Sequence, residues 1–423
     1  MRTRILLLAA LAIALPLIAR QRAVQHREPA PPSSGTPTFS NEVVRIFQQH
    51  CQNCHHPGDI APFSLMEYAD AKPRASLIKI MTQTRQMPPW KAAEGCGDFL
   101  DERRLSNAEI ATIAKWVEAG APEGNRAQLP APRTFSNDWE LGTPDLVLAN
   151  SESFTPPPHE DTYRCFTIPT NLTTDRWVRA VDTHPGDRQT VHHVLTFVDT
   201  TGESQRLDDA EPGPGYTCFG GPGINTTGSL GGWAPGQRAL ELPTDVAFRL
   251  PAGSRVVMQV HYHPHHEETI ADRTAYGVYF SEQPSPKELR FLPIVNQNFT
   301  IPPNDPNYRV DGSFPFALPF PVKIWVIAPH MHLLGRKMEV QYTPRNGTEQ
   351  CLIRIDDWDF NWQGTYRYKQ PIEVPAGAKL TFRAWYDNSV NNPNNPNTPP
   401  KPVSWGEATT DEMALAFVGV TIE

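Results

Sequence analysis

The sequence predicts a multidomain chain, in which a small all-α domain precedes two all-β antiparallel sandwiches of jelly-roll-like form. The chain has 423 residues, more than one ordinary domain holds. Apolar residues at helical spacing run through residues 39–125, and short β-branched runs separated by turn residues follow from 139 onward. The 44 prolines disfavour long helices and suit loops, edge strands and turns.

The N-terminal segment has the pattern of an export signal. Arg2 and Arg4 give it a basic start, and residues 5–19 form an apolar run that is short for a membrane span. We therefore expect a signal peptide at residues 1–20 and a Pro-rich linker at 21–38. The alternative is an uncleaved N-terminal anchor, which would be the only membrane contact. The rest of the protein is predicted to be periplasmic or otherwise exported.

Charge and cysteine content narrow the function further. A formal net charge of −8 argues against a nucleic-acid partner. Six cysteines are present, and in an exported protein those without another role can form disulfides.

The first domain is predicted to be helical over residues 39–125. A capping box at Ser106 and Glu109 opens one helix, which Gly120 and Pro122 end. The apolar face of this helix recurs at i, i+3, i+4 and i+7, at Ile110, Ile113, Ala114 and Val117.

The run Cys51-x-x-Cys54-His55 lies in this domain and predicts covalent haem. Two thiols are needed to add to the haem vinyl groups, and a histidine is needed to ligate the iron. The alternatives are a redox disulfide or half of a zinc site, for which Cys96 is the further ligand available. With the export signal and the helices, the motif favours a c-type cytochrome domain.

The sixth iron ligand is predicted to be Met87. Met66, Met81 and Met87 are the candidates in this domain, and two prolines after Met87 fix an extended loop. A thioether ligand also raises the reduction potential, which suits an electron carrier. The alternative for Met87 is core packing, which is the role expected for Met66 and Met81.

The remaining chain is predicted to form two sandwiches, at residues 139–285 and 286–423. A turn signal at Asn346-Gly347 separates two strand-like runs and indicates a hairpin. The expected strands include Val191–Val198, Arg255–Tyr262, Lys323–Ile327, Met338–Tyr342 and Ala414–Ile422.

Histidines in these strands are candidate metal ligands. His330 and His332 are two residues apart, so on a strand they face the same side. His261 lies in an apolar strand, and an inward imidazole needs a partner or a metal. A histidine pair on a strand can also be incidental. One set of three histidines and one of two histidines with a methionine would suit copper, and the thioether favours Cu(I).

Five motifs in order make the β part similar to the copper type II, ascorbate-dependent monooxygenases, over roughly residues 140–423. They are Asp161-Thr162-Tyr163-Arg164-Cys165, His192-His193, Gln259-Val260-His261-Tyr262, His330-Met331-His332-Leu333-Leu334-Gly335 and Asp411-Glu412-Met413.

The resemblance implies two sandwiches that each hold one copper ion. By this likeness, the electron-transfer copper is bound by His192, His193 and His261. The copper that binds O2 and hydroxylates a C–H bond is bound by the catalytic residues His330, His332 and Met413. The resemblance also pairs Cys165 with Cys218. Cys96 and Cys351 are left over, and a bridge from the cytochrome domain to the second sandwich is one option for them.

The sequence departs from the family where the substrate binds. The peptide-hydroxylating members hold a substrate carboxylate with polar side chains at positions that match Ala328, Leu415 and Phe417, all apolar here. A glycine-extended peptide is therefore not expected. An apolar or uncharged small molecule is the expected substrate.

The sequence thus predicts an exported monooxygenase with haem c and two copper ions. A periplasmic donor would reduce the haem, the haem would reduce copper, and O2 would hydroxylate the substrate. One alternative is a non-enzymatic electron-transfer or copper-handling protein that reuses the sandwiches. Another is a copper–haem reductase acting on a small inorganic molecule.

Overall fold

The computed structural model describes residues 35–135, 139–263, 270–283, 286–406 and 408–423. The predicted signal peptide and all but the last four residues of the predicted linker lie outside these ranges. No helix within the described ranges is long and apolar enough to span a bilayer.

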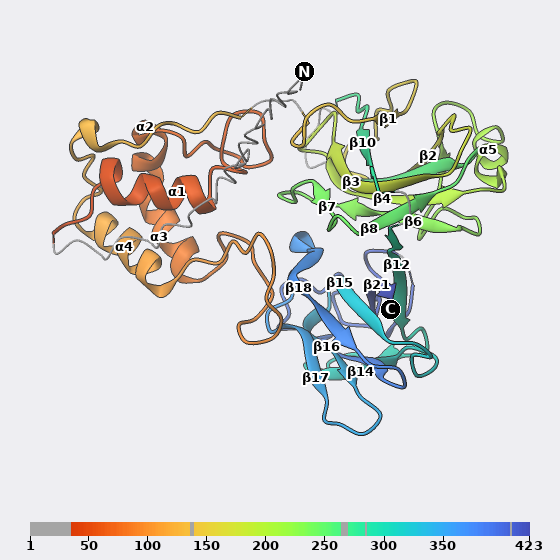
Figure 1. Cartoon of the computed structure of the whole chain (residues 1–423). Helices are drawn as coiled ribbons and strands as arrows, with labels where there is room; N and C mark the ends of the chain where they lie inside the picture. Colours follow the sequence, from red (N-terminus) through yellow and green to blue (C-terminus); the bar gives the residue numbers. More distant parts are fainter. Residues whose placement is uncertain (1–34, 136–138, 264–269, 284–285, 407) are drawn as a thin grey trace, which may run out of the picture. The chain divides into compact units, whose positions relative to one another are not determined.

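The first part of the described chain is helical (Figure 1). The helices are η1 (Phe39–Val43, a π-helix), α1 (Val44–His50), α2 (Tyr68–Ala71), η2 (Lys72–Arg74), α3 (Ala75–Gln83), α4 (Asn107–Glu118) and η3 (Arg126–Gln128). Residues of η1, α1, α2, α3 and α4 share one apolar core, in which Phe47 and Trp116 are fully buried. The predicted capping box opens α4, since the Glu109 N–H donates to Ser106 Oγ at 3.2 Å and the Ser106 N–H donates to Glu109 at 2.8 Å.

Two sheets form the first sandwich. One has the order β1-β10-β3-β8-β11 with β7 beside β3, and the other has the order β5-β2-β9-β4-β6. Their strands are β1 (Leu146–Ala149), β2 (Thr162–Pro169), β3 (Arg176–His184), β4 (Val191–Asp199), β5 (Tyr216–Thr217), β6 (Gly228–Trp233), β7 (Leu240–Glu241), β8 (Val246–Leu250), β9 (Arg255–Tyr262), β10 (Ala275–Phe280) and β11 (Lys287–Glu288). Helix α5 (Glu203–Asp208) follows β4. Residues of both sheets, such as Phe248 and Met258, share one core.

The second sandwich pairs the sheet β12-β21-β15-β18 with the sheet β14-β19-β16-β17. Its strands are β12 (Arg290–Val295), β13 (Thr300–Ile301), β14 (Tyr308–Ser313), β15 (Val322–His330), β16 (Gly335–Thr343), β17 (Gln350–Ile355), β18 (Tyr366–Val374), β19 (Lys379–Tyr386), β20 (Val403–Ser404) and β21 (Leu415–Ile422). The 3-10 turn η4 (Phe360–Trp362) lies between β17 and β18, and β13 pairs with β20. The predicted hairpin joins β16 to β17.

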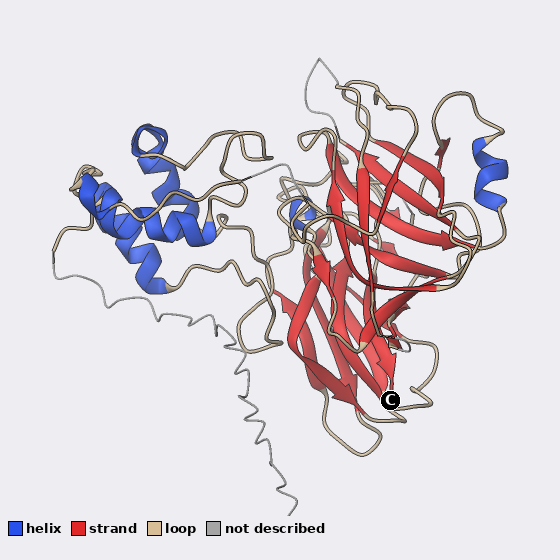
Figure 2. Ribbon diagram, turned by 45° about the horizontal axis from the view of Figure 1, so that its top comes forward, coloured by secondary structure: helices blue, strands red, loops and turns tan. Residues whose placement is uncertain are grey.

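The described chain is therefore mainly β-sheet, with few and short helices (Figure 2). This confirms the predicted β-sandwiches. The longest described helix, α4, has only 12 residues. The assignment of the helical part to a cytochrome c domain, like the domain boundaries, stays a prediction.

Two disulfides join distant parts of the chain. Cys165 pairs with Cys218, as the resemblance implied, with Cα atoms 5.7 Å apart. Cys96 pairs with Cys351 across 255 residues and joins the segment before α4 to β17 of the second sandwich. Such bonds suit an exported protein.

Candidate metal centres

A β-bulge brings His192 and His193 to the same side of the first sandwich. Neighbouring residues on a regular strand point to opposite faces. The pairing of β4 with β9 shifts register between Val191 and His193, and His193 then lies opposite His261. The extra residue lets both rings of the His-His pair approach His261.

The three rings converge through their Nδ1 atoms. His193 Nδ1 lies 3.2 Å from His192 Nδ1 and 3.4 Å from His261 Nδ1. Within the described chain, these three side chains form a group whose potential ligand atoms all lie within 4.8 Å of one another. Two imidazole nitrogens bound to one ion at about 2.0 Å in tetrahedral geometry are about 3.3 Å apart. The donor set therefore fits a single metal ion.

Asp161 orients the buried ring of His261. His261 Nε2 lies 3.1 Å from Asp161 Oδ1, and a carboxylate accepts, so Nε2 carries the proton and Nδ1 keeps its lone pair. His263 also hydrogen-bonds Asp161. Tyr163 stacks on the His261 ring, with centroids 4.1 Å apart. Asp161 lies in a motif that the sequence singled out, but its contact with His261 was not predicted.

The second group of histidines lies at the end of β15. This strand ends at His330, so His332 is placed by the following loop rather than by strand alternation. The two ring centroids nevertheless lie 5.1 Å apart, with the ring planes at 90°. The sequence-based expectation that these rings lie together is met, although the reason given for it, a shared strand face, is not.

Hydrogen bonds at Nδ1 orient both of these rings. His330 Nδ1 lies 2.5 Å from Gln363 Oε1, and Gln363 Nε2 donates to the Phe360 carbonyl at 3.0 Å, which fixes the amide. His332 Nδ1 donates to the Asp411 carbonyl at 3.2 Å. Each Nδ1 therefore carries a proton, which leaves the lone pair on Nε2 for a metal.

Glu412 holds the loops that carry His332 and Met413. Its carboxylate is fully buried and accepts the His332 N–H at 2.9 Å and the Leu334 N–H at 2.6 Å. Burial raises the pKa of Glu412 to about 8, against the effect of these hydrogen bonds. The Met413 carbonyl accepts from Tyr386 Oη at 2.7 Å. Met413 is half-buried and lies two residues before β21, whose first residue, Leu415, pairs with His330.

Burial favours the neutral form of His193, His330 and His332. It lowers the pKa of His330 to about 3 and that of His332 to about 4. Burial also lowers the pKa of His193 well below its ordinary value, and the nearby histidines of both groups act in the same direction. Neutral imidazole is the form that binds metals, and together with a thioether it suits copper.

The Cys51-x-x-Cys54-His55 run continues from the end of α1 as a turn. The Cys54 and His55 N–H groups donate to the Cys51 carbonyl, and both thiols are free. His55 Nδ1 donates to the Phe63 carbonyl at 2.9 Å, so the lone pair lies on Nε2. Burial raises the pKa of Cys51 to about 12, which disfavours a reactive thiolate.

Cys96 cannot serve as a further zinc ligand for this motif, because it is bonded to Cys351. A cavity of about 200 Å³ lies beside the turn, with Asn53, Trp90 and Arg103 among its lining residues. Trp90 Nε1 is buried and has no hydrogen-bond partner within the described residues. Together with the arginine, this donor fits a carboxylate-bearing group such as haem.

Met87 is half-buried just past α3, and its N–H donates to the Met81 carbonyl at 3.1 Å.

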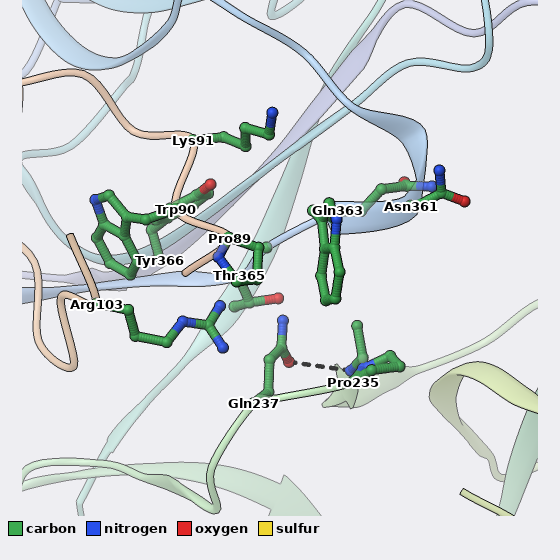
Figure 3. A pocket seen from close by; sticks show the side chains of 13 residues that line it. Pro89, Trp90, Lys91, Arg103, Pro235, Gln237, Asn361, Gln363, Thr365 and Tyr366 are labelled. Carbon is green, nitrogen blue, oxygen red and sulfur yellow. Dashed lines mark hydrogen bonds between the residues drawn. The ribbon is translucent and has the colours of Figure 1, made fainter. Parts of the chain in front are cut away.

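A second, smaller pocket adjoins this cavity and includes Gln363 in its lining (Figure 3). Its walls come from residues 89–91, from the turn 234–237 and from residues 361–366. Gln363, which orients His330, is one of them, and Arg103 and Trp90 line both spaces. The pocket therefore lies between the helical part and both sandwiches.

The comparisons with known proteins bear on the second sandwich above all. Residues 289–419 match the copper type II ascorbate-dependent monooxygenase C-terminal domain. This range contains His330, His332 and Met413. The match supports the predicted relationship to the copper monooxygenases and, through the family, copper as a cofactor.

A human protein named DBH-like monooxygenase protein 1 is 23% identical to this chain over 254 residues. The aligned part covers 55% of this chain and 39% of that protein. The chain thus spans less than half the length of this relative.

Solved structures give only distant likenesses. A cowpea mosaic virus top component covers 69% of this chain and 94% of its own at 7% identity, with a TM-score of 0.30. The infectious bursal disease virus VP2 subviral particle covers 69% of this chain and 74% of its own at 8% identity, with a TM-score of 0.19. Likenesses at this level carry no argument about fold or function.

Proposed function

We propose that this chain is an exported copper-dependent monooxygenase that hydroxylates a C–H bond with O2 and draws electrons through its own haem. The observation that carries the proposal is the convergence of three histidines, of which His261 is fully buried, in one sandwich beside a second histidine pair in a copper-monooxygenase domain. His192, His193 and His261 would hold the electron-transfer copper. His330, His332 and Met413 would hold the copper at which O2 reacts.

The residues of the chain do the positioning. Copper bound at both sites would supply the redox chemistry that activates O2. Asp161 and Gln363 hold protons on the histidine nitrogens that face away from the metal, which keeps the opposite nitrogens available as ligands. Glu412 fixes the backbone on which His332 and Met413 stand.

The helical part would supply electrons. Cys51 and Cys54 would bind haem covalently, with His55 and Met87 as axial ligands. Cys54 lies against the turn after β6, because a Cβ added at Gly236 would lie only 3.3 Å from Cys54 Sγ. At the start of this turn, Trp233 pairs with Val194, the neighbour of His193. This short path supports delivery of electrons from a periplasmic donor through the haem to the first copper.

The face beside His330 supports an apolar substrate. Ala328 pairs with Phe417 two strand positions before the pair formed by His330 with Leu415. These side chains lie on the face opposite the core, to which Ala416 and Val418 belong. Phe417 remains 40% exposed, so the surface next to the second site is apolar and open. A small apolar or uncharged molecule fits there, whereas a carboxylate finds no basic side chain at these positions.

The experiment that tests the proposal is metal and spectral analysis of the full-length protein, exported in a host that attaches haem c. We expect one covalent haem and two type II copper ions per chain, with O2 consumed under a reductant. Absence of O2 consumption by protein that carries both copper ions would overturn the assignment as an enzyme. Absence of covalent haem would overturn the role of the helical part.

A copper-handling or electron-transfer protein is the second candidate, favoured by the apolar residues that replace the family's substrate-binding side chains. A Met413→Ala variant separates the two functions. An enzyme should lose turnover by about tenfold or more while it keeps haem and the three-histidine copper. A carrier should lose copper from the second site. It would show no turnover either before or after the change. Copper content and O2 uptake are measured on the same samples.

A further inference from the structure

Phe360 is in contact with both groups of histidines. Its ring centroid lies 5.7 Å from that of His192, with the planes at 21°, and 5.7 Å from that of His332, with the planes at 84°. One ring thus stacks on a candidate ligand of the first site and meets a candidate ligand of the second edge-on. These are ordinary aromatic contact distances.

Core packing does not explain this ring. Phe360 is half-buried and belongs neither to the apolar core of the second sandwich nor to the partly buried side chains around it. Among the described residues, its aromatic ring contacts are with these two histidines. A large apolar side chain on a short turn, held outside a core and against histidines, has a local role.

The turn that carries Phe360 is fixed on the second site. Trp358 Nε1 donates to the His332 carbonyl at 3.2 Å, and Gln363 accepts from His330 Nδ1. Asp359 caps the turn by accepting the Asn361 N–H at 3.0 Å. The ring of Phe360 is therefore attached to the second site and projects from it to His192.

The helical part also holds this turn. Lys91 Nζ lies 3.1 Å from Asp357 and 3.7 Å from Asp359. The Ala93 N–H donates to the Arg354 carbonyl at 2.7 Å, on the strand that leads into the turn. The position of Phe360 is therefore set from two sides.

We propose that Phe360 is a positioning residue that fixes the spacing of the two copper sites; this rests on the proposed function. The ring lies 5.7 Å, between centroids, from one candidate ligand of each site. A side chain that packs against ligands of both sites, on a turn hydrogen-bonded to the second site, restricts the distance between the two sites. Without this side chain, the distance between the two copper sites would be less well fixed.

The test uses the full-length protein loaded with two Cu(II) ions and compares Phe360→Ala, Phe360→Leu and Phe360→Tyr with the wild type. The readout is the magnetic dipolar interaction between the ions, which falls with the inverse cube of their distance. We expect Phe360→Ala to weaken and broaden this interaction, and Phe360→Tyr, which keeps the ring, to restore it. Phe360→Leu shows whether apolar volume suffices without an aromatic face.

The matched control is Phe316→Ala, which removes a 58% exposed ring elsewhere on the second sandwich and should leave the interaction unchanged. Two bound copper ions with the same dipolar interaction in Phe360→Ala and wild type would overturn the role of Phe360. Fewer than two copper ions in the wild type would instead overturn the proposed function.

Discussion

At the scale of single residues, the candidate ligands are oriented by polar groups that are not themselves predicted to bind metal. Asp161, Gln363 and Glu412 do this for His261, His330 and His332 respectively. Each partner is far from its histidine in sequence, by 100, 33 and 80 positions. Such contacts select the ring nitrogen that faces the metal.

An Asp161→Asn variant should bind the first copper ion less tightly, by on the order of 10- to 100-fold. The amide accepts less strongly than the carboxylate and no longer balances a positive site. Copper affinity is measured by competition with a chelator, and the second site serves as the internal reference. Asp175→Asn is the matched control, because Asp175 pairs with Arg249 on the surface. An equal loss of copper affinity in both variants would show that the effect does not act through His261.

At the scale of elements, local irregularities and caps do the positioning. The bulge in β4 lets two adjacent histidines approach the same partner, which a regular strand forbids. The capping box at the start of α4 is a local device of the same kind. It also holds the helical part together, because the Glu109 carboxylate accepts a hydrogen bond from His50 at the end of α1.

The stability of the helical part should depend on pH through Glu109. Burial alone would raise the pKa of this carboxyl, but hydrogen bonds from His50 and Ser106 lower it to about 2 from 4.5. A carboxyl whose pKa is lowered by folding stabilises the protein above its unfolded pKa. That contribution should be lost as pH falls from about 4.5 toward 2.

A Glu109→Gln variant should lower the free energy of unfolding by about 1 kcal/mol at neutral pH and less at acidic pH. Urea unfolding followed at several pH values checks this. Glu118→Gln on the same helix is the control, since the Glu118 side chain is 59% exposed and should matter little. If the Glu109→Gln variant lost the same free energy of unfolding at all pH values, the ionised Glu109 carboxylate would not be the source of the stabilisation.

At the scale of the whole molecule, one segment joins the helical part to the second sandwich. Cys96 is bonded to Cys351, the Leu100 N–H donates to the Arg367 carbonyl at 2.7 Å, and Lys91 pairs with Asp357. The segment thus holds β17 and β18 on either side of the turn that carries Phe360. Cross-links that close long loops restrict the unfolded chain most.

The double variant Cys96→Ser, Cys351→Ser should lose about 2–4 kcal/mol of stability and become sensitive to proteases near residues 90–101. The physical reason is that the cross-link spans 255 residues of chain. Thermal unfolding and limited proteolysis measure the two effects. Removal of the Cys165–Cys218 bond is the comparison, and it should expose the first sandwich instead. Unchanged cleavage of residues 90–101 would show that hydrogen bonds alone hold the segment.

The sequence by itself determined the local features. The strand Arg255–Tyr262, the capping box of α4, the hairpin after β16 and the histidine motifs all depend on side chains close in the chain, where spacing and turn chemistry suffice. The resemblance paired Cys165 with Cys218, and a bridge between the two cysteines left over, Cys96 and Cys351, was only one option.

Only the tertiary structure decided how the sites are assembled. The bulge that turns His192 and His193 to one side depends on the register of β4 against β9, which no local pattern encodes. The partners Asp161 and Gln363, and the ring of Phe360 between the histidines, come from segments that meet only when the sandwiches pack. Contacts of this kind depend on long-range packing, and so they appear only once the whole chain has folded.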